Sequence, residues 1–414
     1  MKILLISYYF PPCGGAPVQR WLRFLPYLCQ KGHSITVLCS ADGDYPFWDP
    51  DLLKQVPNEI KVIRVRGISM NRIWRRLTGS SSKMPYGKIP KQGNALSRSL
   101  VWLRLNLILP DLRVFWNPFA RQAALDELKK APYDLIISTG PPHSSHLVAR
   151  NLSRQLKKRW FADFRDPLSQ IHYLQLNPPS KPALKILKKM EQEILASADL
   201  SLVVSQAISD SLPQGKKLVL HNGYEPKDFE ALSHHESDVF RIKYIGQITA
   251  GQDIGIFAKL CENLMRDFSL SMIGTKLEDG NEAMLRKSCK ERFALKDFLP
   301  HQQALQEMVD CDLLLLIINR QENNRGILTT KLFEYLASRT PILCFSSADT
   351  DAAGIITKSK AGSFFDYDDV TAAANWVDNL PQGYRTNGNI SSYSIATQAD
   401  ILHEAIIGKI VIDK

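Results

Sequence analysis

The chain has 414 residues, of which 44% are hydrophobic and 23% charged, a composition typical of a globular protein with room for two domains. No run reaches the roughly 18 apolar residues of a membrane span. The Pro/Gly stretch 11–15 also interrupts the apolar start, so we expect neither a span nor a secretory signal. The seven cysteines include no Cys-x-x-Cys pair, which predicts reduced core residues in a cytoplasmic protein and no metal site.

The net charge of +10 is distributed unevenly along the chain. Residues 61–160 contain 20 Lys and Arg against 4 Asp and Glu, a surplus of 16, so the remainder carries about −6. Such a basic zone attracts nucleic acid, an anionic membrane surface or a phosphorylated substrate. Nucleic acid is the weakest of these three partners, because no aromatic–basic binding motif accompanies the charge.

The first half of the chain predicts a parallel sheet. An apolar strand at 2–9 leads through a Pro/Gly loop into an amphipathic helix, and the next strand follows at 34–39, which is a βαβ unit. Further strands are predicted at 61–65, 135–138, 159–164 and 200–204. Residues 67–118 are predicted to be a basic insertion. Within it, Leu100–Leu109 suits either a helix that faces a membrane or substrate, or a plain core helix.

A second alternating set of elements follows a turn-rich break at His221–Asp228 and a polar linker. Strands are predicted at 240–246, 268–274, 313–318 and 341–345, and helices at 302–309, 330–338 and 394–406. We therefore predict an α/β fold with doubly wound domains at 1–228 and 229–388, and a helix within 389–414 that packs back on the first domain. Ligands of such sheets bind outside the carboxyl ends of the strands, which predicts a cleft between the domains.

The most informative segment is 325–344, in which a helix begins near Thr329 and Thr330. The N–H groups of its first turn form an anion site, and Lys331 adds a positive charge beside it. Glu334, one turn further in, suits a carboxylate that accepts hydrogen bonds from ribose hydroxyls. Taken alone, the segment does not decide between this role for Glu334 and a surface glutamate that the helix dipole stabilises.

The loop after the first strand contains Gly14 and Gly15, where a doubly wound domain can receive an anion, although a tight turn explains the pair as well. The Gly-x-Gly-x-x-Gly fingerprint and a Walker lysine are absent from this loop. No acidic residue ends the second strand either, so a nicotinamide enzyme is disfavoured.

Five motifs follow one another over almost the whole chain: Tyr8–Gly15 with Arg20 and Gly32-His33, Pro141–His146, Ala162–Pro167, Asn222-Gly223, and Thr330–Leu336. In this order they resemble the motifs of the GT-B retaining glycosyltransferases of family 4. The resemblance implies two Rossmann-like domains that face a central cleft. It also implies transfer of a sugar, with retained anomeric configuration, from a nucleotide-diphosphate donor such as a UDP-, GDP- or dTDP-sugar. No cofactor and no bound metal is implied.

The resemblance also implies roles for residues. One histidine would contact the donor sugar near the reacting carbon, and we favour His143 because it follows the strand sooner than His146. Cations and amides would stabilise the departing diphosphate. The candidates are His143, His146 and Glu334 for catalysis; Gly14, Gly15, Gly246, Gln247, Gln252, Gly274, Arg325, Thr329, Thr330, Lys331 and Glu334 for the donor; and Arg20, Asp163 and Arg165 for the acceptor. For Asp163, Arg165 and the neighbouring Asp166, structural support is the stronger interpretation.

Three positions depart from the family pattern. Many members carry a Glu eight residues before the donor-helix Glu, where this chain has Gly326, and Arg and Lys where it has Gln247 and Gln252. Each lost cation costs about a few kcal/mol of transition-state stabilisation. Lys276, Arg320 and Arg325 are the basic residues that could compensate.

We therefore expect a cytoplasmic enzyme, peripheral on the membrane, that acts in surface polysaccharide or glycoconjugate assembly. Its basic N-terminal domain would bind a glycan or lipid-linked acceptor. One alternative is a GT-B-fold nucleotide-sugar 2-epimerase, which would epimerise its donor without an acceptor. The other is a catalytically weak scaffold partner of another transferase, which the missing cations favour.

Overall fold

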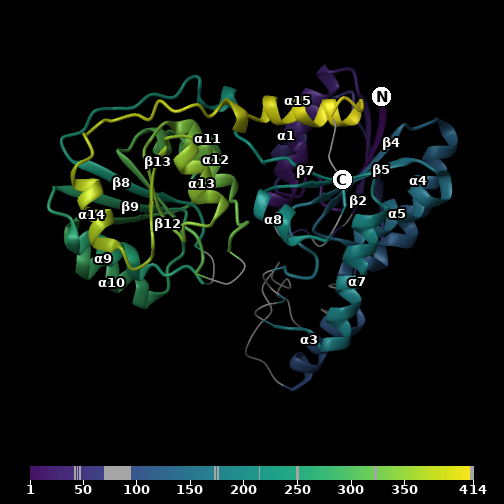
Figure 1. The fold of residues 1–414 in the computed structure, drawn as a ribbon, viewed down its shortest axis with the longest axis horizontal. Helices are drawn as coiled ribbons and strands as arrows, with labels where there is room; N and C mark the ends of the chain where they lie inside the picture. The colour runs from purple at the N-terminus through teal and green to yellow at the C-terminus, as the bar shows by residue number, and fades with distance from the viewer. Residues whose placement is uncertain are drawn as a thin grey trace. The chain divides into compact units, whose positions relative to one another are not determined.

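The structure is a computed structural model that describes residues 1–41, 43, 45, 48–69, 95–171, 174, 177–213, 215–248, 251–320 and 324–410. The chain divides into an N-terminal unit, Met1–Leu220 with Ala399–Lys414, and a C-terminal unit, His221–Gln398. Each unit contains one parallel sheet with helices around it (Figure 1), which confirms the predicted two-domain α/β fold. Residues 70–94 of the predicted insertion lie outside the described residues.

The described residues of the N-terminal unit form a seven-stranded parallel sheet in the order β3-β2-β1-β4-β5-β6-β7. The strands are β1 Lys2–Ile6, β2 Ser34–Ser40, β3 Lys61–Val65, β4 Leu135–Gly140, β5 Arg159–Phe164, β6 Leu200–Val203 and β7 Lys217–Val219. The helices are α1 Ala16–Gln30, α3 Ala95–Leu107, α4 Asn117–Lys130, α5 Ser144–Leu156, α7 Lys181–Ser197 and α8 Gln206–Ser211. The strand order reverses between β1 and β4, which makes this the switch point of the sheet.

The described residues of the C-terminal unit form a six-stranded parallel sheet in the order β10-β9-β8-β11-β12-β13. The strands are β8 Phe240–Ile245, β9 Phe268–Ile273, β10 Phe293–Lys296, β11 Leu313–Ile317, β12 Ile342–Phe345 and β13 Gly362–Phe365. The helices are α9 Gly255–Asn263, α10 Asp279–Cys289, α11 His301–Val309, α12 Thr330–Ser338, α13 Asp351–Lys358 and α14 Val370–Asp378. Here the switch point lies between β8 and β11.

The central strand β11 shows why these sequences fold as two-sided sheets. Leu313, Leu315 and Ile317 join a core cluster with α9, α10 and α14, whereas Leu314 and Leu316 join a second cluster with α11, α12 and α13. Figure 1 shows these two groups of helices on opposite faces of the sheet. A strand buried on both faces needs an unbroken apolar run rather than an alternating one.

The first strand is shorter than predicted. β1 ends at Ile6, not Tyr9, because the chain turns at Ser7, whose hydroxyl donates to the carbonyl of Tyr9 at 2.7 Å. The tyrosines that follow are buried and pack their rings instead, Tyr8 against Trp116 with centroids 5.3 Å apart.

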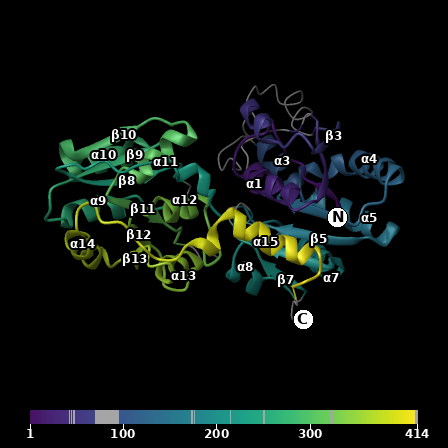
Figure 2. The ribbon, with the colours of Figure 1, turned by 90° about the horizontal axis from the view of Figure 1, so that it is seen from above.

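The last helix, α15 Ile395–Ile406, lies against the N-terminal unit beside α1 (Figure 2). His403 Nδ1 and His33 Nε2 are 2.8 Å apart, and Arg159 donates to the carbonyl of Ile406 at 3.1 Å. An ion pair between Lys31 and Asp400 adds a third link. No helix in the described part of the chain has both the length and the apolarity to cross a bilayer.

The buried Asp163 carboxylate joins three elements of the N-terminal unit. It stands in β5 and accepts hydrogen bonds from Arg20 Nε of α1 at 3.1 Å, Trp21 Nε1 of α1 at 2.8 Å and Thr139 Oγ1 of β4 at 2.8 Å. Arg20 and Asp163 are both buried, so each charge depends on the other for compensation.

We predict that Asp163→Leu lowers the free energy of unfolding by about 3–5 kcal/mol, because it leaves the Arg20 guanidinium buried without its counter-ion. The double variant Arg20→Met/Asp163→Leu should recover part of this loss. Urea unfolding curves measure both effects. Wild-type stability in Asp163→Leu would contradict this structural role and leave binding of an acceptor as the reason for the carboxylate.

Candidate functional site

The switch point of the C-terminal unit collects most of the predicted donor residues. Gly246 directly follows β8, and α12 begins at Thr330 in the segment that follows β11. Thr329 is the residue before the helix, but its hydroxyl caps no N–H group and finds no partner among the described residues although it is buried. The first turn of α12 therefore keeps its N–H groups without a side-chain cap.

Lys331 places its amine at this switch point. Its Nζ donates to the hydroxyl of Tyr244 at 2.8 Å and lies 4.0 Å from the centre of that ring. A Cβ built on Gly246 would meet Lys331 Cε and Nζ at 3.2 Å, so the lysine covers the glycine at the end of β8. Gly246 also has a φ of +113°, a conformation that side chains disfavour.

Burial lowers the pKa of Lys331 to about 7, and Glu334 one turn away partly offsets this shift. The amine is therefore poised to change its charge near neutral pH. Binding of an anion would favour its charged form.

Side-chain hydrogen bonds link the residues at the ends of β8, β9 and β11. Gln247 Nε2 donates to the carbonyl of Gly274 at 2.6 Å, and the hydroxyl of Thr275 donates to the carbonyl of Gly246. Gln252 Nε2 donates to the carbonyl of Ile317 at the end of β11, at 2.9 Å. The two glutamines that stand in place of cations thus hold the edge of the sheet together.

Phe298 is an aromatic residue at this edge that sequence reasoning missed. It follows β10, its side chain is 79% exposed, and a Cβ built on Gly274 would lie 3.7 Å from its ring. In the sequence, Phe298-Leu299 before Pro300 is indistinguishable from a core segment. Only the pairing of β9 with β10 shows that the Phe298 ring is exposed beside Gly274.

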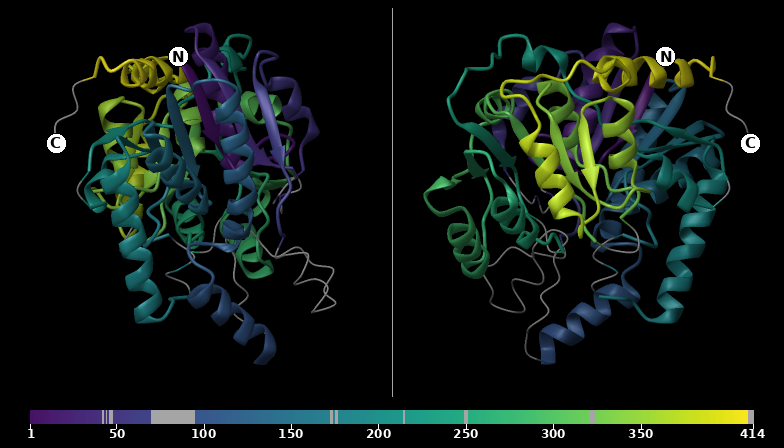
Figure 3. Two further views of the ribbon diagram at one scale, coloured as in Figure 1. Left: turned by 90° about the vertical axis from the view of Figure 1, so that its right-hand side faces the viewer. Right: turned by 60° about the vertical axis from the view of Figure 1, so that its left-hand side comes forward.

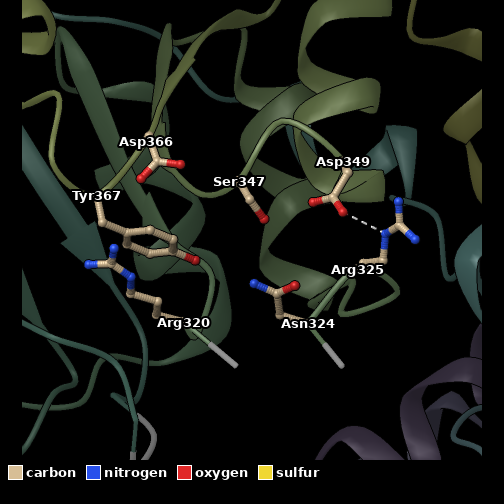
Figure 4. Close-up of a pocket in the computed structure, with 7 residues that line it drawn as sticks. All are labelled: Arg320, Asn324, Arg325, Ser347, Asp349, Asp366 and Tyr367. Carbon is tan, nitrogen blue, oxygen red and sulfur yellow. Dashed lines mark ion pairs between the residues drawn. The ribbon is translucent and has the colours of Figure 1, made fainter. Parts of the chain in front are cut away.

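A pocket of about 450 Å³ lies at the carboxyl ends of β11, β12 and β13 (Figure 4). Figure 4 shows the side chains of Asn324, Ser347 and Asp366 directed toward its centre. Arg325 forms an ion pair with Asp349 at 2.7 Å on one side. The lining residues are Arg320, Asn324, Arg325, Ser347, Asp349, Asp366 and Tyr367.

One aromatic side chain, Tyr367, and one basic side chain, Arg320, line the other side of this pocket. Tyr367 donates its hydroxyl to the carbonyl of Ile318 at 2.7 Å, and the Arg320 guanidinium lies 5.3 Å from the centre of the Tyr367 ring. Arg320 also pairs with Asp368 at 2.9 Å. Of the proposed compensating residues, Arg320 and Arg325 are thus engaged with carboxylates, and Lys276 is exposed.

The predicted histidines are both buried in the N-terminal unit. They follow β4, and a Cβ on Gly140 would lie 2.6 Å from His146 Nε2 and 2.9 Å from His143 Nδ1, so only glycine fits beneath them. His146 is fixed by Ser138, whose Oγ lies 2.8 Å from its Nδ1, and its ring stacks on Phe164 with centroids 4.6 Å apart.

His143 differs from His146 because neither of its ring nitrogens has a hydrogen-bond partner among the described residues. Burial, then the neighbouring His146 and Arg165, hold its pKa well below the usual value, and burial and Arg165 lower the pKa of His146 to about 3. Both imidazoles are neutral at pH 7. Leaving two buried polar atoms unpaired is costly, so His143 is the better candidate for a ligand contact.

The predicted acceptor residues bind one another or the backbone. Arg20 and Asp163 form the buried pair described above, and Arg165 donates to the carbonyls of Gly140 and Pro141 at 3.2 and 2.9 Å. These bonds hold the loop that carries His143. A role toward an acceptor stays a prediction for all three residues.

Gly14 and Gly15 lie between β1 and α1, with Gly15 at a φ of +90° before the first turn of the helix. The strand before them, β1, pairs with β4, so the two glycines lie at the switch point of their sheet. Within the described ranges, no group of three or more His, Cys, Asp and Glu side chains is placed to hold a metal ion.

Two parallel sheets with these switch points define the two-domain fold of the GT-B glycosyltransferases. The structure resembles a sucrose-phosphate synthase from Thermosynechococcus elongatus, with a TM-score of 0.66 at 14% identity over 98% of this chain and 99% of that chain. It also resembles the lipopolysaccharide outer core galactosyltransferase WaaB (TM-score 0.62, 13% identity, 99% and 100% covered). A third neighbour is Anabaena HepE in complex with UDP-glucose (TM-score 0.58, 13% identity, 99% and 100% covered).

At these identities the likeness shows the fold, so the GT-B part of the predicted resemblance is confirmed. Membership of family 4 and a retaining mechanism stay predictions. No protein-family model matches the sequence, and no curated protein matches it in sequence.

The neutral, buried state of His143 gives a prediction for stability against pH. Above pH 6.5 neither the folded nor the unfolded chain protonates this histidine, so its contribution is complete there. As pH falls below 6.5, only the unfolded chain takes up the proton, and stability drops by about 1.4 kcal/mol per pH unit. We expect urea unfolding of His143→Gln to lose about that much less than wild type between pH 6 and 5. Parallel losses in the two proteins would contradict a neutral His143.

Proposed function

We propose that this protein is a glycosyltransferase of the hexosyltransferase type. It transfers a sugar from a nucleotide-diphosphate donor to a glycan or lipid-linked acceptor in surface polysaccharide or glycoconjugate assembly. The proposal includes a retaining, metal-independent reaction and a place on the cytoplasmic face of the membrane. Support comes from the fold, from the named activities and ligands of the neighbours (WaaB, and HepE with UDP-glucose), and from the chemistry of the C-terminal unit.

The observation that carries this proposal is the Lys331 amine over Gly246. Loss of a diphosphate leaving group develops negative charge, and without a metal ion cations and backbone N–H groups have to stabilise it. Lys331 brings an amine to the end of β8 next to the uncapped first turn of α12. This is the region where the family pattern places Arg and Lys in the loop after β8. A lysine from the helix replaces them in our proposal.

We assign the ribose, the base and the sugar of the donor to other residues of the C-terminal unit. Glu334 would accept hydrogen bonds from the ribose hydroxyls. Phe298 follows β10, and its ring stands beside Gly274 at the end of β9, the strand that pairs with β8, where a base would stack on it. The polar pocket with Asn324, Ser347 and Asp366 offers hydrogen-bond partners for the hydroxyls of the sugar.

We assign the acceptor to the N-terminal unit, which carries the basic surplus. His143 would contact the donor sugar near the reacting carbon as a neutral hydrogen-bonding group, since the low pKa removes it as a charged acid at pH 7. A scaffold without catalysis remains the second candidate, because Gly326, Gln247 and Gln252 stand where the family carries charges.

We predict that one nucleotide from a panel of UDP, GDP, dTDP, ADP and CMP raises the melting temperature of the wild type. At a nucleotide concentration of a hundred times Kd, the free energy of unfolding rises by about 2.7 kcal/mol. Glu334→Ala should remove most of this shift because the ribose loses its partner, and Phe298→Ser should weaken binding about tenfold or more through lost stacking. Met265→Ser, which changes an exposed apolar residue before β9, serves as the control. Absence of a shift with every nucleotide would favour the scaffold.

We further predict that diphosphate binding weakens above pH 7. The free protein loses the Lys331 proton through about pH 7, whereas a bound diphosphate retains it. Kd should therefore rise about tenfold per pH unit above 7, with proton uptake on binding. Calorimetry from pH 6 to 9 measures both. Lys331→Met should bind weakly and without this pH dependence, whereas Lys276→Met should keep it. A pH-independent wild type would contradict the role of Lys331.

A further inference from the structure

Helix α3 is apolar on two sides, and the fold accounts for one of them. Val101 and Leu105 pack into the core cluster of the N-terminal unit. Trp102, Leu103 and Leu107 point away from that core and are 55%, 40% and 66% exposed. Exposed apolar residues that follow helical spacing on one element mark an interaction surface.

The partner helix α7 extends this surface with positive charge. The backbone N–H of Ser180, the residue before α7, donates to Asn106 Oδ1 of α3 at 2.7 Å, so the start of α7 is fixed to α3. The first ten residues of α7 contain four lysines and no acidic residue, and all four lysines are exposed; they are Lys181, Lys185, Lys188 and Lys189. Ile186 between them is 49% exposed.

Figures 1 and 3 show α3 and the beginning of α7 together, projecting beyond the sheet of the N-terminal unit. A crossover helix runs back along its sheet, so α7 begins on the side of the carboxyl ends of the strands. The loop that carries His143 emerges on this same side. We call α3 together with residues 181–190 the α3–α7 arm.

The charge of the sequence that leads into and includes α3 favours one kind of partner. Residues 61–110 contain eleven Lys and Arg and no Asp or Glu. Lysines are depleted at protein–protein interfaces, whereas a Trp- and Leu-bearing helix face bordered by lysines is the pattern of helices that lie in the interface of a bilayer. Each lysine near an anionic lipid surface adds attraction that salt screens.

We propose that the α3–α7 arm docks on an anionic lipid bilayer, with Trp102, Leu103 and Leu107 at the acyl boundary and the α7 lysines at the headgroups. The inference rests on the membrane part of the proposed function and identifies the surface that makes the contact. It places the carboxyl edge of the N-terminal sheet toward the bilayer. A lipid-linked acceptor would then reach that unit without leaving the membrane.

The test uses the full chain and vesicles that contain no acceptor: phosphatidylcholine alone, or mixed with phosphatidylglycerol. We expect co-sedimentation with the anionic vesicles only, which weakens as salt rises. Trp102→Ser/Leu107→Ser should lower the affinity roughly tenfold or more. Replacing Lys181, Lys185, Lys188 and Lys189 with Gln should lower it by about fivefold per lysine and remove most of the salt dependence. Brominated lipid should quench tryptophan fluorescence in the wild type, and this quenching should be lost in Trp102→Phe.

Matched controls separate the arm from net charge and from general stickiness. Met265→Ser removes an exposed apolar residue of the C-terminal unit, and a second quadruple variant replaces the exposed lysines Lys287, Lys290, Lys358 and Lys360 with Gln. Both should bind vesicles like the wild type. Nucleotide-induced shifts in melting temperature should persist in the arm variants, so failure of the arm is distinguishable from failure of the donor site.

Three results would overturn the proposal: no binding of the wild type to anionic vesicles, an equal loss in the second quadruple variant, or unchanged quenching in Trp102→Phe. A wild type that ignores vesicles but forms a dimer that Trp102→Ser/Leu107→Ser dissociates would assign the arm to self-association instead.

Discussion

Parallel pairing of the strands is the constraint on which the functional geometry of both units depends. In the described strands every neighbouring pair is parallel, so the loop that follows each strand emerges at the same edge of its sheet. At a switch point the loops on either side diverge, and the edge between them stays open to a ligand. In the C-terminal unit this rule brings the Gly246 end of β8 beside α12, although Gly246 and Lys331 are far apart in sequence.

The position of the cation distinguishes this chain from the pattern that its sequence resembles. A charged side chain in a loop after β8 is solvated in the absence of a ligand, whereas Lys331 is held against Tyr244 and loses part of its hydration. Its charge is therefore conditional on what binds. The glutamines in the β8 loop donate hydrogen bonds to strand ends instead, so neutral side chains stand where the family pattern is charged.

Most of the fold could be predicted from the sequence because its central strands are buried on both faces and read as unbroken apolar runs. The strands that escaped prediction, β7, β10 and β13, stand at sheet edges, where partial exposure dilutes the apolar signal. The sequence predicts Lys331 from its place in the first turn of a helix, and His143 from its position just after a strand. The exposure of Phe298, the Tyr244 contact and the Arg20–Asp163 pair depend on elements that only folding brings together.

The two units hold their polar groups in opposite ways, and this difference bears on which unit supplies electrostatic stabilisation in the proposed reaction. At the carboxyl edge of the N-terminal sheet, Asp163 is neutralised by Arg20, and His143 and His146 are kept uncharged by burial. The basic surplus of that unit includes exposed side chains such as the α7 lysines, where salt screens it. A developing charge on a leaving group needs a desolvated, preorganised partner. Among the described residues Lys331 meets that requirement. We therefore propose that the C-terminal unit supplies the electrostatic stabilisation of the leaving group and that the charge of the N-terminal unit serves attachment.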